Sequence, residues 1–191
     1  MSELLYKTRL RKWFTSLDLK NKYKLIRIAA GDDWQTACRT KQGLFKYSVM
    51  PFGLTNAPAS FQEMMDTIFK DMEGCIWYLD NTLIYGGNTE PEHQAIVEKV
   101  LQQFVEHGLA VNLLKCEFHI KEDIFLGRVI NSQDVKMDPS KLETMSKRPT
   151  PTKKKEVQAF LSFPNYYSRF IVNYSAKVCP LINLTKDIPF T

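Results

Sequence analysis

Two aspartates, Asp18 and Asp80, stand where a carboxylate could take part in catalysis. Asp18 lies near the end of residues 13–19, a segment whose composition predicts a β-strand. Asp80 lies between two short apolar runs, so we expect it at the tip of a hairpin. If the two strands are neighbours, both carboxylates meet at one edge of a sheet and could hold two Mg²⁺ ions about 3.5–4 Å apart. Such a site would carry out phosphoryl or nucleotidyl transfer.

The same residues also have a purely structural interpretation. Asp80 is followed by Asn81, and Asp-Asn is a common turn pair because both side chains bond to the nearby backbone. On this interpretation Asp80 forms a turn and does no chemistry. The residues alone leave both interpretations open.

The elements that must position these aspartates alternate irregularly along the chain. Strands are predicted over residues 13–19, 23–28, 35–40, 44–49, 75–79, 82–85, 110–113 and 124–130. Helices are predicted to begin at Pro58, to run from Thr89 to Gly108, and to cover residues 153–163. The regular β-α-β order of a parallel sheet is missing. The pattern therefore favours an α+β fold, with an antiparallel sheet backed by two helices.

A domain boundary is predicted where Pro149 and Pro151 interrupt the pattern. We expect one domain over residues 1–148 and a second, largely helical one over residues 149–191.

The charge of +5 is unevenly distributed along the chain. Lysines and arginines outnumber acids by 11 to 4 in residues 1–50 and by 13 to 8 in residues 115–191, whereas residues 51–114 carry 2 against 9. Basic flanks around an acidic middle are typical of a protein that contacts a phosphate backbone outside and holds cations inside. Ordinary surface solvation would give the same counts.

Other features exclude some classes of protein. No apolar run approaches the ~20 residues of a membrane span, so we expect no membrane partner and an intracellular location, cytoplasmic or nuclear. The four cysteines form no C-x-x-C pair and are expected to be reduced packing thiols.

Several motifs, in order and at family spacing, make the chain resemble the reverse transcriptases of Ty3/gypsy-type LTR retrotransposons. They are FTSLDL at 14–19, VMPFGLTNAPASFQ at 49–62, YLDN at 78–81, GLAVNLLKCEF at 108–118, FLG at 125–127, PTP at 149–151 and EVQAFL at 156–161. The resemblance covers nearly the whole chain. It implies a reverse-transcriptase palm, an antiparallel sheet backed by helices, followed by the start of a helical thumb or connection.

The resemblance also implies a role for particular residues in the polymerase reaction. Asp18 and Asp80 would be metal ligands for Mg²⁺ or Mn²⁺, with help from the Leu19 carbonyl. Lys115 would donate a proton to pyrophosphate, and Asn81 would occupy the hairpin position beside the ligands.

Further roles concern the nucleotide and the duplex. Tyr23 would exclude a ribose 2′-hydroxyl, and Phe52 would lie beside the incoming nucleotide. Leu126 and Gly127 would form the primer grip, and Gln158 would lie on the thumb surface that follows the minor groove. The implied partners are primer–template RNA/DNA and deoxynucleoside triphosphates.

The chain also departs from the family pattern. Asn81 replaces the second aspartate of the hairpin, Lys22 replaces a small residue, and Pro164 is expected to break the thumb helix. In the thumb helix, Ser162 and Pro164 replace a glycine and an alanine. We further expect the fingers segment, the RNase H region and the integrase region to be absent from this chain.

These observations leave three functional hypotheses. The chain is an RNA-directed DNA polymerase fragment that is weak or inactive, a catalytically dead nucleic-acid-binding remnant, or a structural or interaction domain that keeps only the fold.

Overall fold

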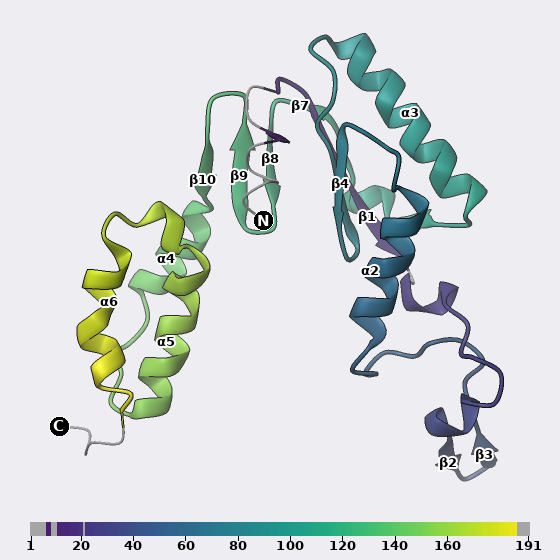
Figure 1. The fold of residues 1–191 in the computed structure, drawn as a ribbon, viewed down its shortest axis with the longest axis horizontal. Coiled ribbons are helices and arrows are strands. Elements are labelled where there is room, and N and C mark those ends of the chain that lie inside the picture. The colour runs from purple at the N-terminus through teal and green to yellow at the C-terminus, as the bar shows by residue number, and fades with distance from the viewer. Residues whose placement is uncertain (1–6, 9–10, 21, 187–191) are drawn as a thin grey trace. The chain divides into compact units, whose positions relative to one another are not determined.

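Figure 1 shows the fold in a computed structural model of the chain. The structure describes residues 7–8, 11–20 and 22–186. The outer ends of the two predicted domains, residues 1–6 and 187–191, lie outside this description.

Two compact units divide the chain, and each is described by itself. The first comprises Met1–Phe125 with Ile130–Val135, and the second comprises Leu126–Val129 with Lys136–Thr191. The predicted boundary after residue 148 divides a palm-like domain from the start of a thumb. That division stays a prediction.

The first unit is built around one sheet with β1 at its centre. Its strands are β1 (Phe14–Lys20), β4 (Cys75–Tyr78), β5 (Asn81–Ile84), β6 (Ala110–Val111) and β7 (Glu117–Ile120). The order is β4-β5-β1-β6, and β7 also pairs with β1. All of the pairings are antiparallel. The predicted antiparallel sheet and α+β class are confirmed.

Two helices supply the other side of the core, α2 (Ala57–Ile68) and α3 (Glu90–Glu106). A single apolar cluster joins Leu17 and Leu19 of β1 to Phe61 of α2 and Val100 of α3. Side chains alternate across a strand, so Ser16 and Asp18 of β1 point to the opposite face. The two helices therefore cover one face of the sheet and leave the Asp18 face free for a site.

A small hairpin and two short 3₁₀ helices lie between β1 and α2. The hairpin pairs β2 (Cys38–Thr40) with β3 (Gly43–Phe45), as predicted around residues 41–43. Residues 23–28 were expected to form a strand, but Lys22–Leu25 form a 3₁₀ helix, η1. Tertiary packing explains the difference, because the Tyr23 ring packs against other aromatic rings of the core face.

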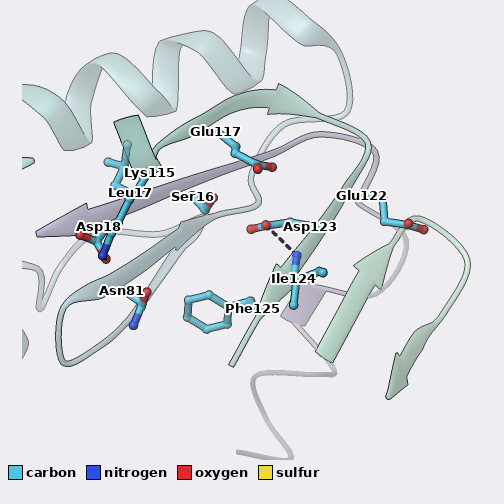
Figure 2. Close-up of a pocket in the computed structure, with 10 residues that line it drawn as sticks. All are labelled: Ser16, Leu17, Asp18, Asn81, Lys115, Glu117, Glu122, Asp123, Ile124 and Phe125. Carbon is cyan, nitrogen blue, oxygen red and sulfur yellow. Dashed lines mark hydrogen bonds and ion pairs between the residues drawn. The ribbon is translucent and has the colours of Figure 1, made fainter. Parts of the chain in front are cut away.

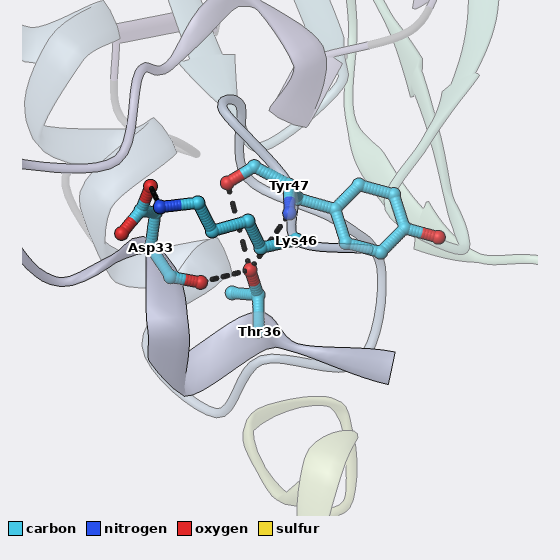
Figure 3. Close-up of polar contacts among 4 residues, drawn as sticks. All are labelled: Asp33, Thr36, Lys46 and Tyr47. Carbon is cyan, nitrogen blue, oxygen red and sulfur yellow. Dashed lines mark hydrogen bonds and ion pairs between the residues drawn. The ribbon is translucent and has the colours of Figure 1, made fainter. Parts of the chain in front are cut away.

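Figure 3 shows how this hairpin is joined to the second 3₁₀ helix, η2 (Asp33–Thr36). The Lys46 ammonium pairs with the Asp33 carboxylate. The Thr36 hydroxyl donates to the Asp33 carbonyl at 2.7 Å and accepts from the Tyr47 amide at 3.0 Å. These contacts are exposed or only partly buried, and every residue of the two hairpin strands is exposed, so polar bonds hold the hairpin in place.

Three short strands form a second sheet in the order β10-β9-β8. They are β8 (Glu122–Phe125), β9 (Arg128–Asn131) and β10 (Val135–Met137). A single strand was expected over residues 124–130. That prediction is wrong because Leu126 and Gly127 both take positive φ angles, 51° and 72°, and turn the chain.

Three helices follow, α4 (Pro139–Ser146), α5 (Lys154–Tyr166) and α6 (Tyr174–Asn183). The predicted helix over residues 153–163 corresponds to α5, but Pro164 does not break it. The proline stands in the last turn of α5, where losing one backbone donor removes little of the helix.

All four cysteines are free thiols. Cys75 is buried, whereas Cys38 and Cys179 are exposed, so the expectation of packing thiols fails for these two. Across the described residues, no helix is both long enough and apolar enough to cross a bilayer.

Candidate active site

Strand pairing brings the two predicted metal ligands to one place. Asp18 of β1 lies opposite Asn81 of β5 in the antiparallel register. The backbone amide of Leu19 donates to the carbonyl of Asp80 at 2.8 Å. The end of β1 and the β4–β5 hairpin are therefore adjacent, and Asp18 and Asp80 lie on neighbouring backbone segments.

The hairpin turn is held from α2. Leu79 takes a positive φ of 53°, a conformation that is unfavourable for a residue with a branched side chain. Its amide donates to the Gln62 side-chain oxygen at 3.0 Å. This bond satisfies a donor in a strained turn and fixes the position of Asp80.

Lys115 reaches the site through a third backbone connection. The Asn112 amide donates to the Asp18 carbonyl at 2.8 Å, which places the short helix η3 (Leu113–Lys115) beside the end of β1. The Lys115 ammonium lies 3.8 Å from the Asp18 carboxylate. Its side chain is 64% exposed, so this ion pair is weak and readily rearranged.

A cavity of about 460 Å³ opens on the Asp18 face of the sheet. Figure 2 shows Asp18 and Lys115 at one end of it, with Asn81 from the hairpin and Phe125 from β8 nearby. Its lining mixes polar and apolar groups and includes the acids Glu117, Glu122 and Asp123. The cavity is large enough for a polar group of a substrate to approach Asp18, which lines it, whereas Asp80 is not among its lining residues.

Lys22 makes the shortest ionic contact at the site. Its ammonium lies 2.8 Å from the Asp80 carboxylate, and its side chain is only 15% exposed. Lys22 and Lys115 thus offset the charges of Asp80 and Asp18, while the three further acids of the cavity lining stand beside them.

A pair of divalent ions at this site would need oxygen ligands and an excess of negative charge. Carboxylate and carbonyl oxygens are the donor type that Mg²⁺ prefers. However, an ammonium already contacts each carboxylate, and Asn81 adds no charge. Within the described residues no group of three or more His, Cys, Asp or Glu side chains could hold a metal. As arranged, the residues do not fit two divalent ions.

The predicted nucleotide-side residues lie near one another. Tyr23 and Phe52 meet edge to face with ring centroids 5.3 Å apart, and Tyr23 also contacts Phe61 at 6.0 Å. Tyr23 is buried and Phe52 is exposed. Leu19 is buried in the core, and its backbone lies beside Asp80.

The predicted nucleic-acid-binding residues all lie in the second unit. Hydroxyls of Tyr166 and Tyr167 donate to the carbonyls of Leu126 and Gly127 at 2.9 and 3.1 Å. Gly127 has a φ of 72°, and a β-carbon there would lie 2.8 Å from the Tyr167 hydroxyl, so a side chain at this position would strain the turn. Gln158 is exposed on α5. The turn and α5 are thus joined by two tyrosines.

Asp123 also lines the cavity, although no sequence motif indicated a role for it. It is 6% exposed, and burial raises the pKa of its carboxyl, with the Glu117 charge adding to the effect. Its Oδ1 accepts from the Ile124 amide at 2.7 Å. Alternation along β8 could have revealed it, because Asp123 must share a face with Phe125.

Comparison with known proteins identifies the family. Residues 2–164 match the family described as reverse transcriptase (RNA-dependent DNA polymerase). The chain is 36% identical over 188 residues to the retrovirus-related Pol polyprotein from transposon 297 of Drosophila melanogaster. It is 36% identical over 188 residues to the transposon Tf2-7 polyprotein of Schizosaccharomyces pombe. Both matches cover 97% of this chain, but only 18% and 14% of the relatives.

Solved structures share the fold. A foamy viral protease-reverse transcriptase in complex with double-stranded DNA superposes with a TM-score of 0.85 and 27% identity, over 93% of this chain and 32% of that one. The foamy viral enzyme in complex with an RNA/DNA hybrid gives 0.82 and 27%, over 94% and 25%.

The chain therefore spans a small part of the length of its curated relatives, and its motifs, fold and similarity agree. It belongs to the reverse transcriptase family, as a domain related to the Pol polyproteins of Ty3/gypsy-type LTR retrotransposons.

Proposed function

We propose that this chain is a polymerase palm with the start of a thumb, which binds primer–template duplex and transfers nucleotides to a primer 3′-hydroxyl at a strongly reduced rate. The observation that carries the proposal is the pairing of β1 with β5, which holds Asp18 and the Asp80 hairpin side by side. Deoxynucleoside triphosphates are the proposed substrates, and Mg²⁺ or Mn²⁺ is the proposed cofactor.

The reduced rate follows from charge at the site. Asn81 stands opposite Asp18 and contributes no negative charge. Removing a group that supports a metal ligand typically reduces metal affinity or enzyme activity by about 10–100-fold. Positioning and charge stabilisation supply most of the rate in phosphoryl transfer, so a site with one carboxylate fewer is expected to turn over slowly.

A duplex-binding domain without catalysis is the second candidate. It is favoured by the two ammonium groups that contact the two carboxylates, because a divalent cation would have to displace or tolerate a positive charge at each of them. The relatives solved with double-stranded DNA and with an RNA/DNA hybrid make a duplex the natural ligand to test.

Primer extension tests catalysis. The chain as it stands, Asp18→Asn and Asn81→Asp are compared on an annealed primer with Mg²⁺ and with Mn²⁺, and Asp71→Asn serves as an exposed acidic control. We expect trace extension that Asp18→Asn abolishes, and less than a tenfold gain from Asn81→Asp. Rapid steady-state extension by the unmodified chain would contradict the reduced rate.

Duplex binding is tested by fluorescence anisotropy across a salt series. Phosphate contacts position a duplex without reading its sequence, so affinity should fall steeply with salt and vary little with sequence. A flat salt response, or no binding at low salt, would instead favour a structural or interaction domain.

A further inference from the structure

The ammonium of Lys22 lies directly beside the Asp80 carboxylate. It lies 2.8 Å from the Asp80 Oδ1 atom. The same ammonium lies 5.2 Å from the centroid of the Tyr23 ring, within the range of a cation–π contact. Lys22 is therefore held by a carboxylate on one side and an aromatic face on the other.

The second lysine of the site, Lys115, is held less firmly beside its carboxylate than Lys22. Lys115 lies 3.8 Å from Asp18, and its side chain is 64% exposed against 15% for Lys22. Longer, exposed ion pairs exchange freely with water and salt. Lys22 is the lysine that would stay in place.

We propose that Lys22 acts as a tethered cation that replaces a divalent ion at Asp80. This inference rests on the proposed function, because it concerns the same carboxylates. It assigns the loss of metal affinity to a residue outside the hairpin, in η1, and makes Asn81 the smaller of two defects.

The physical basis is competition for one carboxylate. A tethered group acts at a high effective concentration, because its chain holds it near the site. A divalent ion must displace the ammonium, shed part of its own hydration and then accept a nearby positive charge. Removing the charge at residue 22 while keeping the side-chain length removes this competition.

A consequence concerns the protein without metal. The lysine already neutralises Asp80, so the fold gains nothing from a divalent ion. The melting temperature of the unmodified chain should therefore be the same in Mg²⁺ and in EDTA. With Lys22→Met, Mg²⁺ should raise the melting temperature, because only the folded state binds the ion.

Mn²⁺ binding, read from the loss of the free-ion electron paramagnetic resonance signal, tests the proposal without reference to activity. Lys22→Met should bind Mn²⁺ at least about tenfold more tightly than the unmodified chain, in line with the effect of changes beside metal ligands. Lys24→Met is the matched control, because Lys24 is an exposed lysine of the same helix. It should leave Mn²⁺ affinity unchanged.

Two further variants define the site. Lys22→Arg keeps the positive charge and should bind Mn²⁺ as weakly as the unmodified chain. Asp80→Asn added to Lys22→Met should abolish the gain. Equal Mn²⁺ affinity for Lys22→Met and Lys24→Met would overturn the proposal, as would a gain that survives Asp80→Asn.

Failure of this inference is distinguishable from failure of the proposed function. Tighter Mn²⁺ binding by Lys22→Met supports the tethered cation even if no primer is extended. Primer extension that depends on Asp18, together with unchanged Mn²⁺ affinity in Lys22→Met, supports the function and overturns the tethered cation.

Discussion

His93 and Asp123 are both polar and buried within the first unit, yet their surroundings differ. His93 of α3 is 0% exposed. Its Nδ1 lies 2.8 Å from the Gly86 carbonyl and its Nε2 lies 2.9 Å from the Thr15 hydroxyl. A carbonyl only accepts, so Nδ1 carries the proton and Nε2 accepts from Thr15. Both ring nitrogens are satisfied by a neutral imidazole.

Asp123 of β8 is 6% exposed and only partly satisfied. Within the described residues its Oδ2 atom accepts no hydrogen bond, although the Ser16 hydroxyl is near enough to lower the carboxyl pKa slightly. Its neighbour Ile124 is 59% exposed. The polarity of these two positions is the reverse of what their burial requires.

The difference shows that burial of a polar group is favourable or costly according to its partners. A fully bonded group such as His93 links α3 to β1 and to the chain after β5. An unpaired buried polar atom lowers the free energy of unfolding by about 1–3 kcal/mol and links no elements. The buried His93 therefore stabilises the packing of α3 on β1, whereas the buried Asp123 lowers the stability of β8.

The largest expected effect is from His93→Leu. It would leave the Gly86 carbonyl and the Thr15 hydroxyl short of a partner, so we expect a loss of about 3 kcal/mol in the free energy of unfolding. Urea denaturation measures it. The control is His107→Leu at the exposed end of α3, expected within about 0.5 kcal/mol of the unmodified chain. Equal losses at the two histidines would remove the basis of the comparison.

The next effect has the opposite sign. Exchanging polarity with Asp123→Val and Ile124→Asp should raise the free energy of unfolding by about 2 kcal/mol, because the unpaired carboxylate leaves the interior. Ile124→Asp alone changes an exposed position and should be nearly neutral. A double variant no more stable than Ile124→Asp would show that water or a partner already satisfies Asp123.

The two residues should also give opposite pH responses. Burial lowers the pKa of His93 from 6.5, so the unfolded chain binds more protons and stability falls as pH drops below about 6.5. Burial raises the pKa of Asp123 from 3.8, so the folded chain binds more protons there and stability falls as pH rises above about 3.8. Urea midpoints measured across pH should test both responses. His93→Leu should lose the fall in stability below about pH 6.5, and Asp123→Val should lose the fall above about pH 3.8.

The smallest effect should come from the exposed pair in the hairpin. The hydrogen bond from Lys46 is the main cause that lowers the pKa of the Asp33 carboxyl from 3.8. Lys46→Met should raise this pKa toward 3.8, as read by nuclear magnetic resonance titration, without a measurable change in stability. A clear loss of stability would mean that exposed and buried contacts contribute alike here.

The sequence predicted those parts of the fold that local patterns determine. The β4–β5 hairpin, α2 and α3 follow from periodicity and turn residues. The pairing of β1 with β5 meets the condition that the strands of Asp18 and Asp80 are neighbours. Residues 23–28 were assigned wrongly because aromatic packing, which depends on distant residues, overrides local propensity.

Contacts at the site were less predictable. The Lys22–Asp80 pair joins residues 58 positions apart, and it depends on the register of β1 with β5. No local pattern contains that information. The inward orientation of Asp123 was predictable in principle, but only once β8 was separated from β9 at the Leu126–Gly127 turn.

Burial of Cys75 also has a consequence for the chemical reactivity of the chain. Desolvation raises the pKa of its thiol to about 12, and the thiolate is the species that reacts with disulfide and maleimide reagents. Cys75 should therefore react only when the core around β4 opens. Its modification rate then reports how often that opening occurs. Cys38 and Cys179 are exposed, one in each compact unit, and should react first. The slow modification of Cys75 can thus be compared with the fast modification of Cys38 and Cys179 in the same molecule.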